Sequence, residues 1–162
     1  FAAGEIQQAV QKKDWDLFCK RVDVARVYSY ALDDMLAELK ADGLPEHAIA
    51  ASLVKSIKKE VVKELIRQTE IRFKDGAPAS KSLLDKPVKT LTAYAGSSAL
   101  SLTDIFKIEE KDGKAIAYVQ LEDKDLSRDF IWQVQLEKDV NGLWTATRIL
   151  NFKEYLKERM DG

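Results

Sequence analysis

The spacing of hydrophobic residues changes from a helical to a strand period roughly two thirds of the way along this chain. In the first part, apolar residues recur every three or four positions, and the longest such series is Ile49, Leu53, Ile57, Val61 and Leu65. In the last third they alternate with polar residues, as in Phe130, Trp132, Val134 and Leu136. The first period is typical of amphipathic helices and the second of half-buried strands. Helices that precede a run of strands predict an α+β fold, with the helices packed on one face of an antiparallel sheet.

Four helices are predicted before residue 75. The first covers residues 5–13, and Asp14 and Asp23 are suited to cap the second and third because their side chains can accept hydrogen bonds from first-turn amides. Gly43 is the expected stop of the third helix. The fourth and longest extends from about Pro45 to about Phe73. Its four-residue repeat drifts around a helix of 3.6 residues per turn, so we expect this helix to wrap across its neighbours or to bend.

The whole chain, 1–162, is expected to form a single domain, since one core commonly serves roughly 100–200 residues. We divide it into a helical half at 1–75, a connecting segment at 76–101, a sheet half at 102–150 and a C-terminal helix at 151–160. The connecting segment contains prolines, a glycine and several serines, and its periodicity is too weak to choose between short helical pieces and a short strand.

The sheet half is predicted to be a meander of four strands, which cover residues 102–110, 114–122, 128–138 and 143–150. Lys111-Asp112-Gly113 is a hairpin signal. Asn141-Gly142 is the strongest turn signal, because both residues tolerate the positive φ of a type I′ turn. Asn151 is expected to cap the closing helix.

Composition and charge exclude several classes of function. The 26 Lys and Arg nearly balance the 27 Asp and Glu and are interleaved with them, whereas nucleic-acid-binding proteins usually show a basic surplus or a basic stripe, so no nucleic-acid partner is expected. No stretch approaches the roughly 20 apolar residues that span a bilayer, so no transmembrane segment is predicted. The single cysteine, Cys19, excludes an internal disulfide and a cysteine-based zinc cluster, and its place beside Phe18 predicts a buried, inert thiol.

No catalytic or metal-binding pattern is present. The only histidine, His47, lies in the first turn of a helix, and no second ligand or relay partner can be placed beside it. The acidic run Glu122, Asp123, Asp125 and Asp129 lacks the glycine and spacing of a calcium loop, so a solvated turn is the better interpretation. Asp33-Asp34 similarly fits a helix surface. The seven glycines form no nucleotide-binding motif. We therefore predict no catalytic residue, no metal and no cofactor; an enzymatic alternative would rest on Glu122 and Asp104.

The alternation assigns residues to two faces of the sheet. The face expected to lie in the core carries Phe106, Val119, Leu121, Phe130, Trp132, Val134 and Leu136. The opposite face is expected to carry Tyr118, Gln120, Ile131, Gln133 and Gln135, and Trp144 and Arg148 are also considered for it. A solvent-facing surface is the favoured interpretation of that second face. The alternative is a pocket between the long helix and the sheet, close to Tyr94, Tyr118, Trp132 and Trp144.

The opening of the chain resembles a known family. Ile6 to Val10, Lys13-Asp14, Phe18 and Val22-Asp23-Val24 through Val27 are similar to the helical start of an uncharacterised family of bacterial envelope proteins and lipoproteins with a β-rich end. The order of helices and a four-stranded meander is also similar to the cystatin-like and nuclear-transport-factor-like cone folds. The first resemblance implies an extracytoplasmic, secreted or membrane-anchored protein, and it supplies no catalytic residues.

The expected function is therefore a non-enzymatic binding module. The leading hypothesis is a protein-interaction or accessory module of the bacterial envelope with an unknown protein partner. The alternative is a domain that binds a small apolar ligand in the pocket defined by the four aromatic residues.

Overall fold

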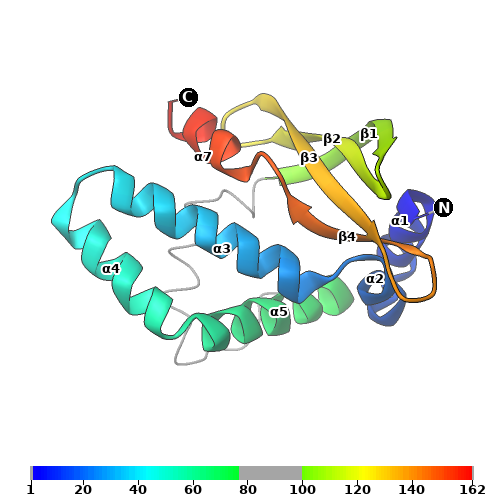
Figure 1. Cartoon of the computed structure of the whole chain (residues 1–162), viewed down its shortest axis with the longest axis horizontal. Helices are drawn as coiled ribbons and strands as arrows, with labels where there is room; N and C mark the ends of the chain where they lie inside the picture. Colours follow the sequence, from blue (N-terminus) through cyan, green and yellow to red (C-terminus); the bar gives the residue numbers. More distant parts are fainter. Residues whose placement is uncertain (1, 77–99, 162) are drawn as a thin grey trace.

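The chain completes its described N-terminal helices before it reaches its strands (Figure 1). The computed structural model describes residues 2–76 and 100–161. The elements in these ranges are α1 (Ala2–Lys12), α2 (Trp15–Arg21), α3 (Val24–Ala41), α4 (Pro45–Ser56), α5 (Lys58–Asp75), β1 (Leu100–Lys111), β2 (Lys114–Asp123), β3 (Arg128–Lys138), β4 (Trp144–Ile149) and α7 (Phe152–Asp161). The sheet has the order β1-β2-β3-β4, and each neighbouring pair is antiparallel. This arrangement confirms the predicted α+β fold, its four-stranded meander and its C-terminal helix. Most of the predicted connecting segment, 77–99, lies outside the described residues.

The two hairpin turns of the sheet differ in geometry, and only the first has the type I′ form. Asp112 and Gly113 both have positive φ, 54° and 75°, so this turn has the type I′ signature. At the second turn only Gly142 has a positive φ, also 75°. There the Asp139 carboxylate accepts hydrogen bonds from the amides of Asn141 and Leu143 at 2.8 and 3.0 Å. These side-chain bonds hold the loop in place of a two-residue type I′ turn. The prediction of a type I′ turn at Asn141-Gly142 is therefore wrong.

One face of the sheet, called the inner face, lies against the helices. Paired residues on it include Leu121 with Phe130 and Val119 with Trp132. Phe106 was expected there but is 48% exposed, and its ring lies 6.2 Å from that of Tyr118 on the other, outer face. The register of β1 shifts between Ile105 and Lys107, so Phe106 is an extra residue in a bulge. A bulge changes which face the following side chains reach, and this explains the error.

The core joins the inner face to the helices. Figure 1 shows α3 running beside β4, with α7 near the start of β3 and α5 on the far side of α3. The largest cluster of buried residues combines side chains from α3, α4, α5, β3, β4 and α7. The Tyr155 ring meets the Phe130 ring edge-on at 5.0 Å, so α7 is fastened to β3 by aromatic packing.

The predicted long helix is two helices. α4 ends at Ser56, and α5 begins at Lys58 after Ile57, whose φ of −118° and ψ of 27° are not helical. The Ser56 hydroxyl donates to the Leu53 carbonyl at 2.7 Å, a local bond that bends helices. The drift of the four-residue repeat therefore ends in a break, because both halves must pack on α3.

The predicted caps of α2 and α3 are confirmed, but that of α7 is not. Asp14 accepts from the Leu17 amide at 3.0 Å and Asp23 from the Arg26 amide at 3.2 Å. The Asn151 side chain instead bonds to the backbone of β3, accepting from Gln133 and donating to Ile131, both at 2.8 Å. Asn151 thus fastens the end of the sheet to the start of α7.

The turn between β2 and β3 also differs from its prediction. Asp123 is completely buried, although the acidic run was expected to be solvated. Its Oδ1 accepts from the amides of Asp125 and Leu126 at 3.0 and 3.1 Å. Its Oδ2 forms an ion pair with Arg159 of α7. The carboxylate is therefore an internal fastening between the turn and the C-terminal helix.

Candidate functional site

The aromatic residues of the predicted pocket lie apart. Tyr94 is outside the described residues. Tyr118 lies on the outer face, where its hydroxyl donates to Glu109 at 3.0 Å. Trp132 lies on the inner face, edge-on to Phe152 and Tyr155 at 5.9 and 5.4 Å. The structure therefore does not bring Tyr118 and Trp132 into one cavity, because the sheet separates them.

Trp144 lies at the other end of the sheet. It is opposite Lys138 in the register, on the inner face, and it packs against a small cluster of Ala115, Ala117, Leu136 and Ala146. The Lys138 ammonium lies 5.1 Å from the centre of its ring. Arg148, which was considered with Trp144 for the outer face, does pair with Gln135 there. Trp144 is thus a packing residue near the sheet end.

A hollow of about 580 Å³ lies elsewhere, between the α2–α3 junction, α5 and the loop from β3 to β4. The α2–α3 junction lies against β4. The Asp23 amide donates a hydrogen bond to the Ala146 carbonyl at 2.8 Å, and Val22 forms an isolated parallel β-bridge with Ala146. Val22, Val24, Ala25, Ile66 and Leu143 form its apolar walls, and the polar lining residues are Cys19, Lys20, Arg21, Asp23, Asp139, Asn141 and Thr145. A volume of this size is within the range of small-molecule sites.

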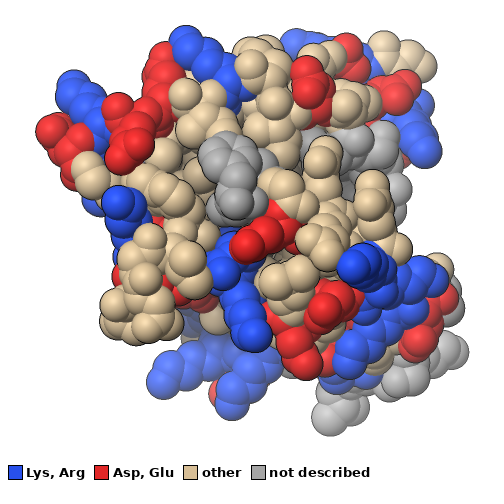
Figure 2. All heavy atoms as spheres, turned by 90° about the vertical axis from the view of Figure 1, so that its right-hand side faces the viewer, with Lys and Arg blue, Asp and Glu red and all other residues tan. Residues whose placement is uncertain are grey.

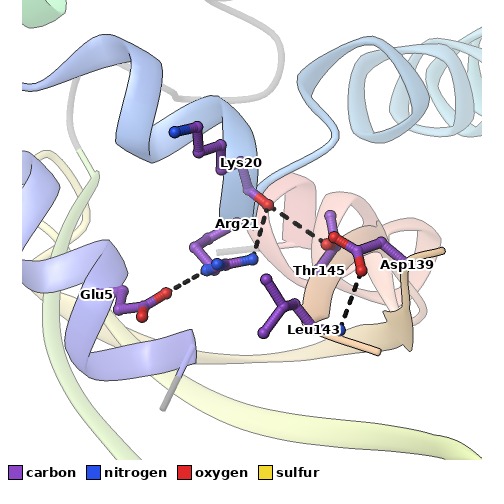
Figure 3. Close-up of polar contacts among 6 residues, drawn as sticks. All are labelled: Glu5, Lys20, Arg21, Asp139, Leu143 and Thr145. Carbon is purple, nitrogen blue, oxygen red and sulfur yellow. Dashed lines mark hydrogen bonds and ion pairs between the residues drawn. The ribbon is translucent and has the colours of Figure 1, made fainter. Parts of the chain in front are cut away.

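The polar groups around the hollow hold the fold together (Figure 3). Arg21 forms an ion pair with Glu5 of α1, and its Nη1 donates to the Lys20 carbonyl at 3.2 Å. The Thr145 hydroxyl donates to the same carbonyl at 3.4 Å. In Figure 3 the Lys20 side chain extends away from Thr145 and Asp139. The polar residues beside the hollow therefore hold the surrounding elements together, and the buried Arg21 guanidinium is already paired with Glu5.

Cys19 is exposed at the edge of this hollow, so the prediction of a buried thiol is wrong. Partial desolvation raises the pKa of the thiol, and the nearby carboxylates of Glu70 and Asp16 raise it further. A raised pKa keeps the thiol protonated at neutral pH, and the thiolate is the reactive form. The environment of Cys19 is the opposite of that of a catalytic cysteine.

The titratable groups singled out from the sequence form no common centre. His47 pairs through Nδ1 with Asp42, whose carboxyl pKa is lowered by a hydrogen bond from the Leu44 amide and then by His47. Asp104 and Glu122 are both exposed. Within the described ranges, no three His, Cys, Asp or Glu side chains are grouped so as to hold a metal ion.

Asp34 is buried rather than on the helix surface, which corrects the prediction. Desolvation raises the pKa of its carboxyl, while Arg148 of β4 opposes this shift. The two side chains are 3.8 Å apart, and the Arg148 guanidinium also lies 4.5 Å from the centre of the Tyr30 ring. This group ties α3 to the sheet edge.

Among the described helices, α4 has the large apolar side chains with the highest exposed fractions. Ile49 and Leu53 are 63% and 64% exposed, and Leu44, just before the helix, is 46% exposed. The same helix buries Ala51 and Val54 against its neighbours. Ile49 and Leu53 are four residues apart and so lie on one side of α4. We call Leu44, Ile49 and Leu53 the α4 apolar face. Ile49 and Leu53 both belong to the four-residue repeat, from which the sequence predicted a helix that wraps across its neighbours or bends, and no exposed face.

The end of the molecule that carries α1 and α2 has no surface patch of one charge sign among its described residues in the view of Figure 2. Figure 2 shows acidic and basic side chains interleaved there. None of the helices in the described ranges has the length and apolarity needed to cross a membrane.

Comparison with known proteins found no matching family model, no similar curated protein and no similar solved structure.

Proposed function

We propose that this chain is a non-enzymatic protein-interaction module and that the α4 apolar face is its docking surface. The observation that supports this is the exposure of Ile49 and Leu53, each above 60%, beside each other on one helix. Apolar side chains at i and i+4 are the anchors by which a helix enters a groove of another protein. Binding would remove both side chains from water, which is worth roughly 1.5–3 kcal/mol for each one that becomes fully buried.

The surroundings of the face fit the same role. Glu46, Ala50 and Ser52 are exposed along α4 and offer a small and polar rim. An interface with an apolar centre and a polar rim is the usual anatomy of protein contacts. We further propose, from the resemblance of the first forty residues, that the protein and its partner are located outside the bacterial cytoplasm. Fractionation of cells that produce the natural protein into cytoplasm and envelope tests this location.

The experiment compares two charge insertions. Ile49→Lys with Leu53→Lys places charge in the α4 apolar face, and Val140→Lys places charge on a fully exposed residue of the β3–β4 loop. Each variant is immobilised and exposed to an envelope extract, and bound proteins are identified by mass spectrometry. A protein held by the unmodified chain and by Val140→Lys, but lost from the α4 variant, supports the proposal. Equal retention by all three chains refutes the α4 surface, provided that circular dichroism shows the variants folded.

A second candidate function, binding of a small apolar ligand, is favoured by the hollow beside Leu143 and Ile66. Native mass spectrometry would detect a retained ligand as extra mass that is lost on denaturation. Leu143→Trp fills part of the hollow and should remove that mass, whereas Val140→Trp should not. A clean apo mass from freshly purified protein, with no change in melting temperature across a panel of apolar compounds, would contradict this candidate.

A further inference from the structure

The charges that line the hollow beside the α2–α3 junction do not cancel once their contacts are taken into account. Four of the lining residues carry charge: Lys20, Arg21, Asp23 and Asp139. The Arg21 guanidinium is buried and is already paired with Glu5 of α1. The Lys20 side chain extends away from Asp139 in Figure 3. The charge that remains at the hollow is therefore that of the two aspartates.

Each of these aspartates uses one of its two carboxylate oxygens to hold the backbone. Asp23 Oδ1 accepts a hydrogen bond from the Arg26 amide at 3.2 Å, and Asp139 Oδ1 accepts from the amides of Asn141 and Leu143 at 2.8 and 3.0 Å. An ionised carboxylate has about four lone-pair sites. No ion pair between described residues involves either aspartate. Both side chains thus keep an oxygen that can accept from a ligand.

The hollow, of about 580 Å³, combines these two carboxylates with apolar walls. Ligand sites of this kind bury an apolar body, and a few placed polar groups fix its orientation. An anionic ligand would be repelled by the two like charges. An ammonium group matches them, because a hydrogen bond between charged partners is roughly twice as strong as a neutral one. We propose that the hollow binds a small amphipathic amine, with its apolar body against Ile66 and Leu143 and its ammonium group beside the carboxylates of Asp23 and Asp139.

This inference rests on the second candidate function, ligand binding in the hollow, and adds the charge that the ligand carries. It does not depend on the α4 apolar face, which lies on a different helix. An amine and a neutral alcohol with the same apolar body separate the inference from the candidate function. Binding of the alcohol tests the hollow itself, whereas a preference for the amine tests the two carboxylates.

Asparagine at each position removes the charge and keeps the contacts that hold the fold. It caps helices about as well as aspartate, so Asp23→Asn preserves the cap of α3. Asp139→Asn retains a side-chain oxygen for the amides of the β3–β4 loop. The matched control is Asp14→Asn, because Asp14 caps α2 by the same kind of bond and is not among the residues that line the hollow.

The experiment compares phenylbutylamine, phenylbutanol and phenylbutyrate, which share one apolar body. Each is titrated at pH 7 into the isotope-labelled protein, and dissociation constants are obtained from the NMR shifts of amides around the hollow, such as that of Leu143. For the unmodified chain and Asp14→Asn, we expect the amine to bind about three- to tenfold more tightly than the alcohol, and the butyrate to bind more weakly than either. In the double variant, Asp23→Asn with Asp139→Asn, the amine should bind no more tightly than the alcohol, whose own affinity should be unchanged.

The outcomes distinguish the inference from the function on which it rests. Equal binding of the amine and the alcohol by the unmodified chain overturns the inference and leaves the apolar-ligand candidate standing. The inference is also overturned if the double variant keeps the preference, if Asp14→Asn loses it, or if the butyrate binds as tightly as the amine. An absence of shifts around the hollow with all three probes overturns the inference and counts against the second candidate function as well.

Discussion

Removal of the Asp123 carboxylate should be among the most destabilising single substitutions in this protein. The side chain is fully buried, accepts from two turn amides and pairs with Arg159, whose own side chain is 14% exposed. Asp123→Ala leaves both amides without their acceptor, at about 1–1.5 kcal/mol each, and leaves a mostly buried guanidinium unpaired. Breaking a buried pair by removing one partner typically costs about 3–5 kcal/mol. We expect a loss of about 4 kcal/mol in the free energy of unfolding, measured by urea denaturation.

The matched variant Asp123→Asn separates the two contributions. Asparagine keeps an oxygen for the amides of Asp125 and Leu126 but removes the charge that Arg159 contacts, so its cost should be about half that of alanine. In a double-mutant cycle, Asp123→Ala with Arg159→Ala should cost less than the sum of the single changes, because the second change removes the unpaired charge. A loss below about 1 kcal/mol for Asp123→Ala, or strict additivity in the cycle, would refute the assignment of Asp123 as a fastening of α7.

Other predictions follow from burial and pKa. Leu156 is 1% exposed, and Leu156→Ala should cost about 2–5 kcal/mol by urea denaturation; a cost under about 1 kcal/mol would mean that α7 is not packed as described. Burial raises the pKa of Tyr155 to about 12, whereas an unfolded tyrosine ionises near pH 10, so the folded state retains a proton that the unfolded state loses and stability should fall from about pH 10 to about pH 12. Tyr155→Phe should reduce that fall, and an identical pH dependence in the variant would count against a buried phenol. Cys19 should react with a thiol reagent at pH 7 more slowly than a free cysteine, and replacing Glu70 and Asp16 by their amides should speed the reaction; no acceleration would contradict their effect on the thiol pKa.

The architecture could be predicted from the sequence because hydrophobic period is a local property. The change from period 3.6 to period 2 identifies the helices, the meander and the terminal helix without knowledge of any contact. The capping aspartates Asp14 and Asp23 were found for the same reason, since their partners lie three residues away. The outer face was also largely correct, although the bulge that transfers Phe106 to it left no signal in the alternation of β1.

The binding surfaces were harder to predict because they depend on which residues the fold leaves without a partner. Ile49 and Leu53 belong to the same four-residue repeat as Val61 and Leu65, yet the first two are exposed and the last two buried. The four-residue repeat predicted that the helix would wrap or bend, but it does not show where the helix breaks or which of its apolar residues the fold buries. The hollow joins Cys19, Ile66 and Leu143, which are far apart in sequence and carry no shared motif.

The burial of charged residues was also hard to predict, because the sequence does not show which distant residues will pair with them. Asp123 and Asp34 lie in acidic runs, a pattern that usually indicates solvated surface, yet both are buried because Arg159 and Arg148 arrive from distant elements to meet them. These are the contacts that join α7 to the β2–β3 turn and α3 to β4. A buried carboxylate costs stability unless it is paired, so each pairing makes the docking of its helix specific. α4 has no such ion pair to the sheet among the described residues; the ion pair beside the bend joins Lys58, at the start of α5, to Asp33 of α3. α4 is also the helix that exposes Ile49 and Leu53, so the surface proposed for docking lies on a helix that no ion pair among the described residues fixes to the sheet.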